Sequence, residues 1–169
     1  MMIIIVLVIM LLISLITDIK NRKILNSVTL PSILIAFLYH LISNGFGGLL
    51  FSGKGFLVGL GLLIIPYLLG GMGAGDVKLL AAIGSLMGTI FVFYSFIYTA
   101  LIGGAIALVL IIKKKGFINI IKSTLFNVVF FRNDLGSMII AKDKESIISF
   151  PYGVPIVLGT LCTLVWGGF

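Results

Sequence analysis

Residues 70–112 read GGMGAGDVKLLAAIGSLMGTIFVFYSFIYTALIGGAIALVLII, a glycine run and one aspartate followed by a long apolar stretch. As one straight helix, residues 77–112 would be about 54 Å long at 1.5 Å per residue, well beyond a hydrocarbon core of about 30 Å. Two membrane spans joined by a tight turn near Gly88-Thr89 fit this stretch better than one.

The composition indicates a polytopic membrane protein. Of 169 residues, 60% are hydrophobic and only 10% are charged, and the mean hydropathy is +1.31. A soluble domain of this size would carry more charge. The length suits a single membrane-embedded domain over 1–169. The stretch Met1–Ile16 has no basic segment and no small-x-small cleavage site, so it is predicted to be a retained first helix and not a signal peptide.

The apolar runs predict an all-α fold with six transmembrane helices and a cytoplasmic amphipathic helix before the last span. A polar stripe over 116–131 indicates that amphipathic helix, lying on the membrane surface or packed on the bundle. Residues 44–48 read as a turn, and Gly55-x-x-x-Gly59 predicts close helix packing. The approximate spans are 2–17, 28–43, 55–69, 77–88, 90–112 and 147–166.

The distribution of basic residues predicts the topology. With the N-terminus and the C-terminus outside, the loops at 18–27, 70–78 and 113–146 face the cytoplasm. These loops hold all lysines and arginines except Lys54, as expected for the cytoplasmic side of a cell-membrane protein. The net charge of +7 therefore reflects topology and contacts with anionic membrane lipids, and no nucleic-acid partner is predicted.

Two of the five acidic residues, Asp18 and Asp76, border long apolar runs, where a carboxylate is costly unless it has a function. Two spans separate them, so both lie on the cytoplasmic face. Two adjacent carboxyl groups cannot both ionise easily, so the pair holds one proton. The ionised member can then activate water while the protonated member polarises a carbonyl group. A catalytic aspartate pair is the prediction. Helix-end ion pairs with Lys20 or Lys78 are the structural alternative.

The glycines before Asp76 leave room for a substrate backbone. Gly73 and Gly75 lack the Cβ that would block the close approach of an unwound peptide. Tight helix packing is the alternative explanation, and the spacing does not match a phosphate-binding loop. Cys162 is the single cysteine, so no cysteine metal site is predicted. No feature indicates a metal site or a cofactor.

The motifs resemble those of type IV prepilin peptidases. Gly73-Ala74-Gly75-Asp76 looks like their GxGD signature, and residues 18–26 (DIKNRKILN) resemble their first aspartate motif. Leu25 replaces the usual proline, a departure that concerns loop stiffness more than catalysis. Residues 150–155 (FPYGVP) resemble the proline-rich approach to the family's last helix, near the active site. The resemblance covers essentially the whole chain.

This resemblance implies an aspartic endopeptidase that removes the short basic leader of prepilin-like proteins on the cytoplasmic side, in type IV pilus assembly and protein secretion. The catalytic residues that the resemblance implies are Asp18 and Asp76. Substrate-binding or site-shaping positions are Gly73, Gly75, Lys78, Pro151 and Pro155. The chain is most similar to the small members of Flp/tight-adherence pilus systems and archaeal preflagellin peptidases. The methyltransferase region of larger members has no counterpart in the sequence, so N-methylation is not predicted.

Two other functions are alternatives to the peptidase. A small proton-coupled transporter could use both acids as a proton relay, but such acids are expected near the bilayer midplane and with an internal repeat. A catalytically silent pilus-assembly protein is the second. His40 is predicted at the outer end of the second span, across the membrane from both aspartates, and has no expected catalytic role.

Overall fold

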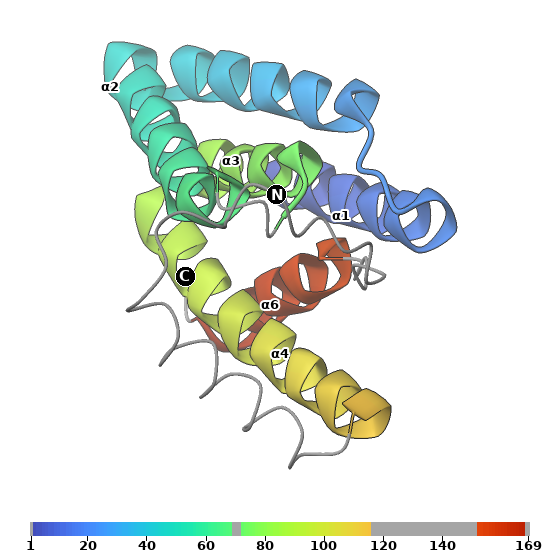
Figure 1. The fold of residues 1–169 in the computed structure, drawn as a ribbon. Helices are drawn as coiled ribbons and strands as arrows, with labels where there is room; N and C mark the ends of the chain where they lie inside the picture. The colour runs from blue at the N-terminus through green and yellow to red at the C-terminus, as the bar shows by residue number, and fades with distance from the viewer. Residues whose placement is uncertain (1, 69–71, 116–151, 168–169) are drawn as a thin grey trace, which may run out of the picture. The chain divides into compact units, whose positions relative to one another are not determined.

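The computed structural model describes residues 2–68, 72–115 and 152–167. The all-helical class predicted from the sequence is confirmed for these residues. The amphipathic helix predicted over 116–131 lies outside the described residues, as does the start of the last predicted span at 147–151. The helices are α1 (Met2–Asn21), α2 (Asn26–Leu68), α3 (Ala74–Met87), α4 (Thr89–Lys115) and α6 (Gly153–Trp166) (Figure 1).

Three helical segments in the described part of the chain are long and apolar enough to cross a membrane: Met2–Asn21, Asn26–Leu68 and Thr89–Val109. Helices α3 and α6 are shorter, with 14 residues each. These long apolar helices indicate a membrane protein.

The chain divides into two compact units. The first holds residues 1–103 and 150–169 and contains α1, α2, α3, α6 and the first half of α4. The second covers residues 104–149, of which the structure describes only the last part of α4. All contacts described below lie within the first unit.

Helix α2 bends at Gly45, which has φ 58° and ψ −144° and therefore lies outside the helical region. A positive φ suits glycine, which has no Cβ to clash with the backbone. The turn predicted over 44–48 is in fact this one-residue break, because the helix resumes at Phe46. Figure 1 shows the resulting two arms, 26–44 and 46–68, which run in different directions.

The second arm of α2 packs closely against α3 through small residues. A Cβ added at Gly55 would clash with the backbone carbonyl of Gly84, and one added at Gly59 would lie 2.5 Å from the carbonyl oxygen of Leu80. Only glycine allows the two helix backbones to approach this closely, which matters where lipid supplies no hydrophobic drive for helix association. The close packing predicted from Gly55-x-x-x-Gly59 is confirmed.

Helix α3 lies in the centre of the first unit. Its residues from Leu79 to Leu86 are all buried, together with core side chains of α1 and α6. Helix α3 ends at Met87 and α4 begins at Thr89, with Gly88 between them at φ 87°. The apolar stretch 77–112 is therefore divided where the sequence predicts it.

The C-terminal carbonyl groups of α3 are satisfied by side chains from both arms of α2. The hydroxyl of Ser52 donates to the carbonyl of Ser85 at 2.8 Å, and Nε2 of His40 lies 3.1 Å from the carbonyl oxygen of Leu86. Because a carbonyl oxygen only accepts, Nε2 is the protonated ring nitrogen. A helix end leaves such carbonyls unpaired, and in a membrane no water replaces the missing donors. His40 thus lies at the end of α3 opposite Asp76.

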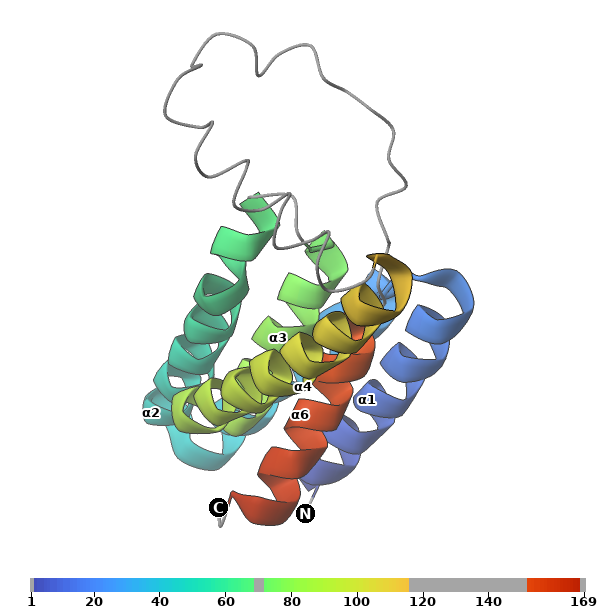
Figure 2. The ribbon, with the colours of Figure 1, turned by 60° about the horizontal axis from the view of Figure 1, so that its bottom comes forward.

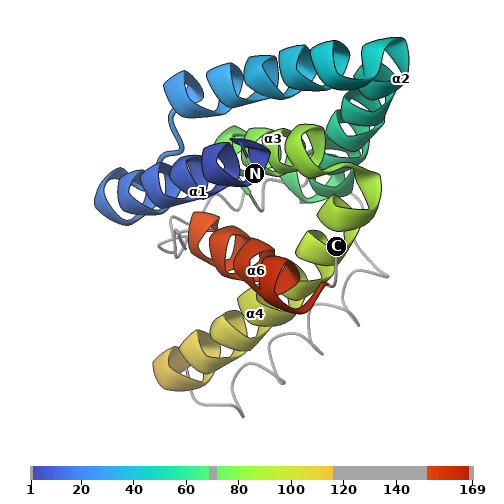
Figure 3. The ribbon, with the colours of Figure 1, turned by 180° about the vertical axis from the view of Figure 1, so that it is seen from behind.

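Helix α6 packs antiparallel to the first half of α4 along a seam of small and hydroxyl-bearing residues. Ser95 Oγ donates to Thr163 Oγ1 at 3.3 Å. One turn along, a Cβ on Gly159 would lie 2.5 Å from Thr99 Oγ1. Helix α6 also packs on α1, so that it lies between α1 and α4 (Figures 2 and 3).

Candidate active site

Asp18 lies in the last turn of α1, on the face of the helix that points into the protein. This buried face carries Leu7, Leu11, Ser14 and Asp18, at alternating spacings of four and three residues. The Asp18 side chain is only 4% exposed. Helix α1 continues four residues beyond the predicted end at residue 17 and closes at Arg22, whose φ is 50°.

The Asp18 carboxylate lies directly against the N-terminus of α6. A Cβ added at Gly153 would lie 2.6 Å from Asp18 Oδ2 and 2.9 Å from its Cγ. The backbone amides of Gly153 and Val154 are the groups of α6 that interact with the carboxylate. Oδ2 nevertheless has no hydrogen-bond partner among the described residues. The partial positive charge of a helix N-terminus favours an anion there.

Asp76 lies in the first turn of α3, where it caps the helix. The Gly73 N–H donates to Asp76 Oδ2 at 3.2 Å, and the Asp76 N–H donates to the Gly73 carbonyl at 3.1 Å. The Asp76 side chain is 8% exposed. These two hydrogen bonds between Gly73 and Asp76 hold the Asp76 carboxylate at the start of α3.

The two carboxyl groups interact with each other. Burial raises the pKa of Asp76 from 3.8 to about 6, the amide of Gly73 opposes this rise, and repulsion from Asp18 adds to it. Asp18 is thus near enough to Asp76 to affect its pKa, and two carboxyl groups that share one proton could supply both a base and an acid.

The other predicted site residues have different surroundings. Gly75 faces the connection between α1 and α2, where a Cβ would lie 3.0 Å from Ile24 Cβ. The space beside Gly75 is therefore occupied by the chain itself. Lys78 Nζ donates to Asn26 Oδ1 at 3.0 Å. Pro155 is buried in the first turn of α6, close to Gly103 of α4. Pro151 lies outside the described residues.

The structure adds residues that sequence reasoning did not select. Gly153 lies against Asp18, and Asn26 binds Lys78. Ser14 Oγ is buried without a hydrogen-bond partner in the described part of the chain, one turn before Asp18 on the same helix face. Ser14 could have been selected from the sequence, because it lies four residues before Asp18 on the helix face that also carries Leu7 and Leu11. Asn26 had no comparable signal, because its partner comes from another helix.

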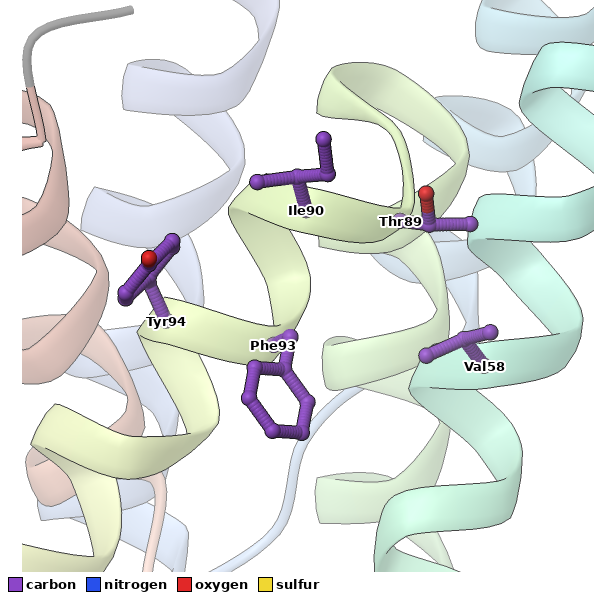
Figure 4. Close-up of a pocket in the computed structure, with 5 residues that line it drawn as sticks. All are labelled: Val58, Thr89, Ile90, Phe93 and Tyr94. Atoms are coloured by element: carbon purple, nitrogen blue, oxygen red, sulfur yellow. The ribbon is translucent and has the colours of Figure 1, made fainter.

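A shallow apolar groove of about 360 Å³ lies away from both aspartates, at the opposite end of α3. It is formed by the second arm of α2 and the start of α4 (Figure 4). Its lining residues are Val58, Thr89, Ile90, Phe93 and Tyr94. No group of three or more potential metal ligands occurs within 2–68, 72–115 and 152–167.

Comparison with known proteins identifies one family. The model of the type IV leader peptidase family matches residues 5–108, a range that includes both Asp18 and Asp76. Comparisons with curated proteins and with solved structures give no significant match. The matched range covers more than half of the chain, and it agrees with the resemblance carried by the two aspartate motifs. The chain therefore belongs to the type IV leader peptidase family, a family of proteases.

Proposed function

We propose that this protein is a membrane aspartic endopeptidase that removes the short basic leader of type IV prepilin-like proteins, using Asp18 and Asp76. The single observation that supports the proposal best is that Asp18 and Asp76, from different helices, are both buried, with Asp18 near enough to raise the pKa of Asp76. The family match supports leader peptidase activity in general. The proposal concerns proteolysis.

The proposed reaction begins with the pair holding one proton. The ionised carboxylate takes a proton from water as the water oxygen attacks the scissile carbonyl carbon. The protonated carboxyl group donates a hydrogen bond to the carbonyl oxygen during this step. When the tetrahedral intermediate collapses, the C–N bond breaks and the amine nitrogen takes a proton from a carboxyl group. The pair ends with one proton and is ready for the next cycle.

The proposed topology has six spans, with the two arms of α2 counted separately. In this arrangement the turn at Gly45 and the turn at Gly88 face outside, while Asp18 and Asp76 lie on the cytoplasmic side. Helix α3 is about 21 Å long, which is shorter than a hydrocarbon core of about 30 Å. The caps that His40 and Ser52 provide support this arrangement, because they allow the short helix to end inside the bilayer.

The proposed substrate has a basic leader followed by an apolar helix. The apolar helix would lie in the bilayer beside the enzyme and present the leader junction at the cytoplasmic face. The helix around the scissile peptide bond must unwind before the carboxyl groups can reach that bond. Gly73 lies beside Asp76 with only ordinary contacts around its missing Cβ, so a substrate backbone has room to approach on that side.

The test is cleavage of a prepilin-like substrate by the purified protein in lipid nanodiscs, with the products identified by mass spectrometry. Wild-type protein should shorten the substrate by its leader. Asp18→Asn and Asp76→Asn keep the shape of each side chain but remove its acid–base function. Each variant should lose at least about 1,000-fold in rate, since each group acts in proton transfer and both act as a unit.

Asp134→Asn is the matched control, because it makes the same chemical change at an acid outside the proposed pair, and it should cleave at the wild-type rate. Wild-type cleavage by either Asp18→Asn or Asp76→Asn would contradict the two-aspartate mechanism. An intact substrate together with proton-coupled solute uptake into proteoliposomes would instead favour the transporter.

A further inference from the structure

The segment that joins α1 to α2 is attached to the first turn of α3 by two contacts. Lys78 Nζ donates to Asn26 Oδ1 at 3.0 Å. Beside this bond, a Cβ on Gly75 would lie 3.0 Å from Ile24 Cβ and 3.4 Å from its carbonyl oxygen. The first contact is polar and the second is a close steric fit. Together they hold the joining segment against α3.

This attachment connects the segment that follows Asp18 to the first turn of α3, which carries Asp76. The N–H of Arg22 donates to the carbonyl of Asp18 at 2.8 Å and closes α1, and α2 begins at Asn26. Asp18 is therefore only a few residues from Ile24. On the other side of the contact, Asp76 directly follows Gly75. A shift of the joining segment along α3 would move Asp18 relative to Asp76.

Lys78 is bonded to Asn26, although it is only two residues from Asp76. Residues two apart on a helix point in different directions, so the ammonium group and the Asp76 carboxylate do not face each other. Within the described residues, the bond to Asn26 is the contact that places the Lys78 side chain. The contact with Asn26 therefore supports a connecting role for Lys78 and not an ion pair with Asp76, the alternative that the sequence offered.

We propose that the Lys78–Asn26 hydrogen bond and the Ile24–Gly75 contact form a latch that sets the separation of the Asp18 and Asp76 carboxyl groups. Lys78 and Asn26 are then positioning residues, which act on catalysis through the aspartates and do not touch the substrate. The inference rests on the proposed peptidase function. The latch makes Asn26, which lies four residues after Arg22, as important as Lys78 for placing the two carboxyl groups.

A double-mutant cycle tests the latch. The variants are Lys78→Met, Asn26→Ala and the combination, assayed for kcat and KM on the prepilin-like substrate. Each single variant should lower kcat about tenfold and leave KM within about twofold, because a small misplacement of reacting groups reduces rate more than binding. The combination should be no slower than either single variant. Asn26→Asp keeps an oxygen acceptor for Lys78 and should retain kcat within about twofold of wild type.

Lys20→Met is the matched control. Lys20 is an exposed lysine in the last turn of α1, and the same substitution there should leave kcat and KM unchanged. Additive losses in the combination would overturn the latch, as would a large loss in Lys78→Met with no loss in Asn26→Ala. A rise in KM as the main effect of Lys78→Met would show that Lys78 binds substrate instead.

The same cycle is also measured by the thermal unfolding midpoint in nanodiscs, which does not depend on peptidase activity. The two substitutions should lower the midpoint by less together than the sum of their separate effects. If wild-type protein cleaves no prepilin, the proposed function fails, and the latch is judged by this coupling alone. If wild-type protein cleaves and both cycles are additive, the latch fails and the proposed function stands.

Discussion

The carboxylate of Asp18 lies directly against the backbone of Gly153, the first residue of α6, so closely that a Cβ on Gly153 would lie 2.6 Å from Oδ2. The contact joins the end of the first helix to the start of the last. The space beside the Gly153 Cα holds a hydrogen atom and no larger group. Gly153 is therefore a candidate site residue, because any larger side chain would collide with the Asp18 carboxylate.

Gly153→Ala should lower the cleavage rate by about 10- to 100-fold, because the new methyl group must push either Asp18 or the N-terminus of α6 away. Gly61→Ala is the matched control, since a Cβ at Gly61 meets nothing within 4 Å. Both rates are measured with the prepilin-like substrate. Equal rates for Gly153→Ala and wild type would show that the contact between Asp18 and α6 does not position the carboxylate.

The pKa of Asp76, raised to about 6, predicts how the cleavage rate depends on pH. Because repulsion from ionised Asp18 contributes to this rise, the pair holds its one proton on Asp76 below about pH 6. As the pH rises through about 6, Asp76 loses that proton and both acids are ionised, so the rate should fall. The pH–rate profile of kcat tests this and reports the pair, not one residue. A rate that stays constant as the pH rises from 5 to 8 would contradict the assignment.

The raised pKa of Asp76 also affects the stability of the folded protein. A carboxyl group whose pKa is higher in the folded protein favours folding below its unfolded value of 3.8, and this contribution disappears as the pH rises through about 6. Ionised Asp76 therefore costs about 3 kcal/mol at pH 8. Asp76→Asn should raise the unfolding temperature at pH 8, and the gain should vanish near pH 4. Thermal unfolding of both proteins at these two pH values is the measurement.

The His40 side chain should contribute stability and no catalysis. His40→Leu leaves the carbonyl oxygen of Leu86 without a donor inside the membrane and should cost about 1–3 kcal/mol. Ser32→Ala is the control, because the Ser32 hydroxyl donates to a carbonyl of its own helix, Val28, and its loss should cost little. Unfolding free energies are compared in detergent micelles. Loss of cleavage by a fully stable His40→Leu protein would instead indicate a direct role.

The proposed topology predicts which side of the membrane is accessible at two exposed lysines. In a Cys162→Ser background, Lys54→Cys should react with a membrane-impermeant maleimide added to intact cells. Lys20→Cys should react only after the membrane is permeabilised. Labelling of both positions in intact cells would contradict the predicted location of Asp18 on the cytoplasmic side.

Much of this protein follows from its sequence. Hydropathy alone predicts an all-helical membrane protein, because apolar segments of this length must satisfy their own backbone hydrogen bonds. The length of the stretch 77–112 predicts the division that occurs at Gly88. The scarcity of acids points to Asp18 and Asp76, and their motifs indicate the family that the comparison identifies.

Only the tertiary structure shows how these parts meet. Three contacts join residues far apart in the chain: Gly153 with Asp18, Lys78 with Asn26, and His40 with the end of α3. Periodicity predicts which face of one helix is buried, but not which residue of another helix lies against it. The glycine before Asp76 illustrates the limit: the sequence suggests room for a substrate at Gly75, and the structure places Ile24 there. The sequence supplies the two aspartates, whereas their geometry depends on how α1, α3 and α6 pack together, which no local sequence pattern determines.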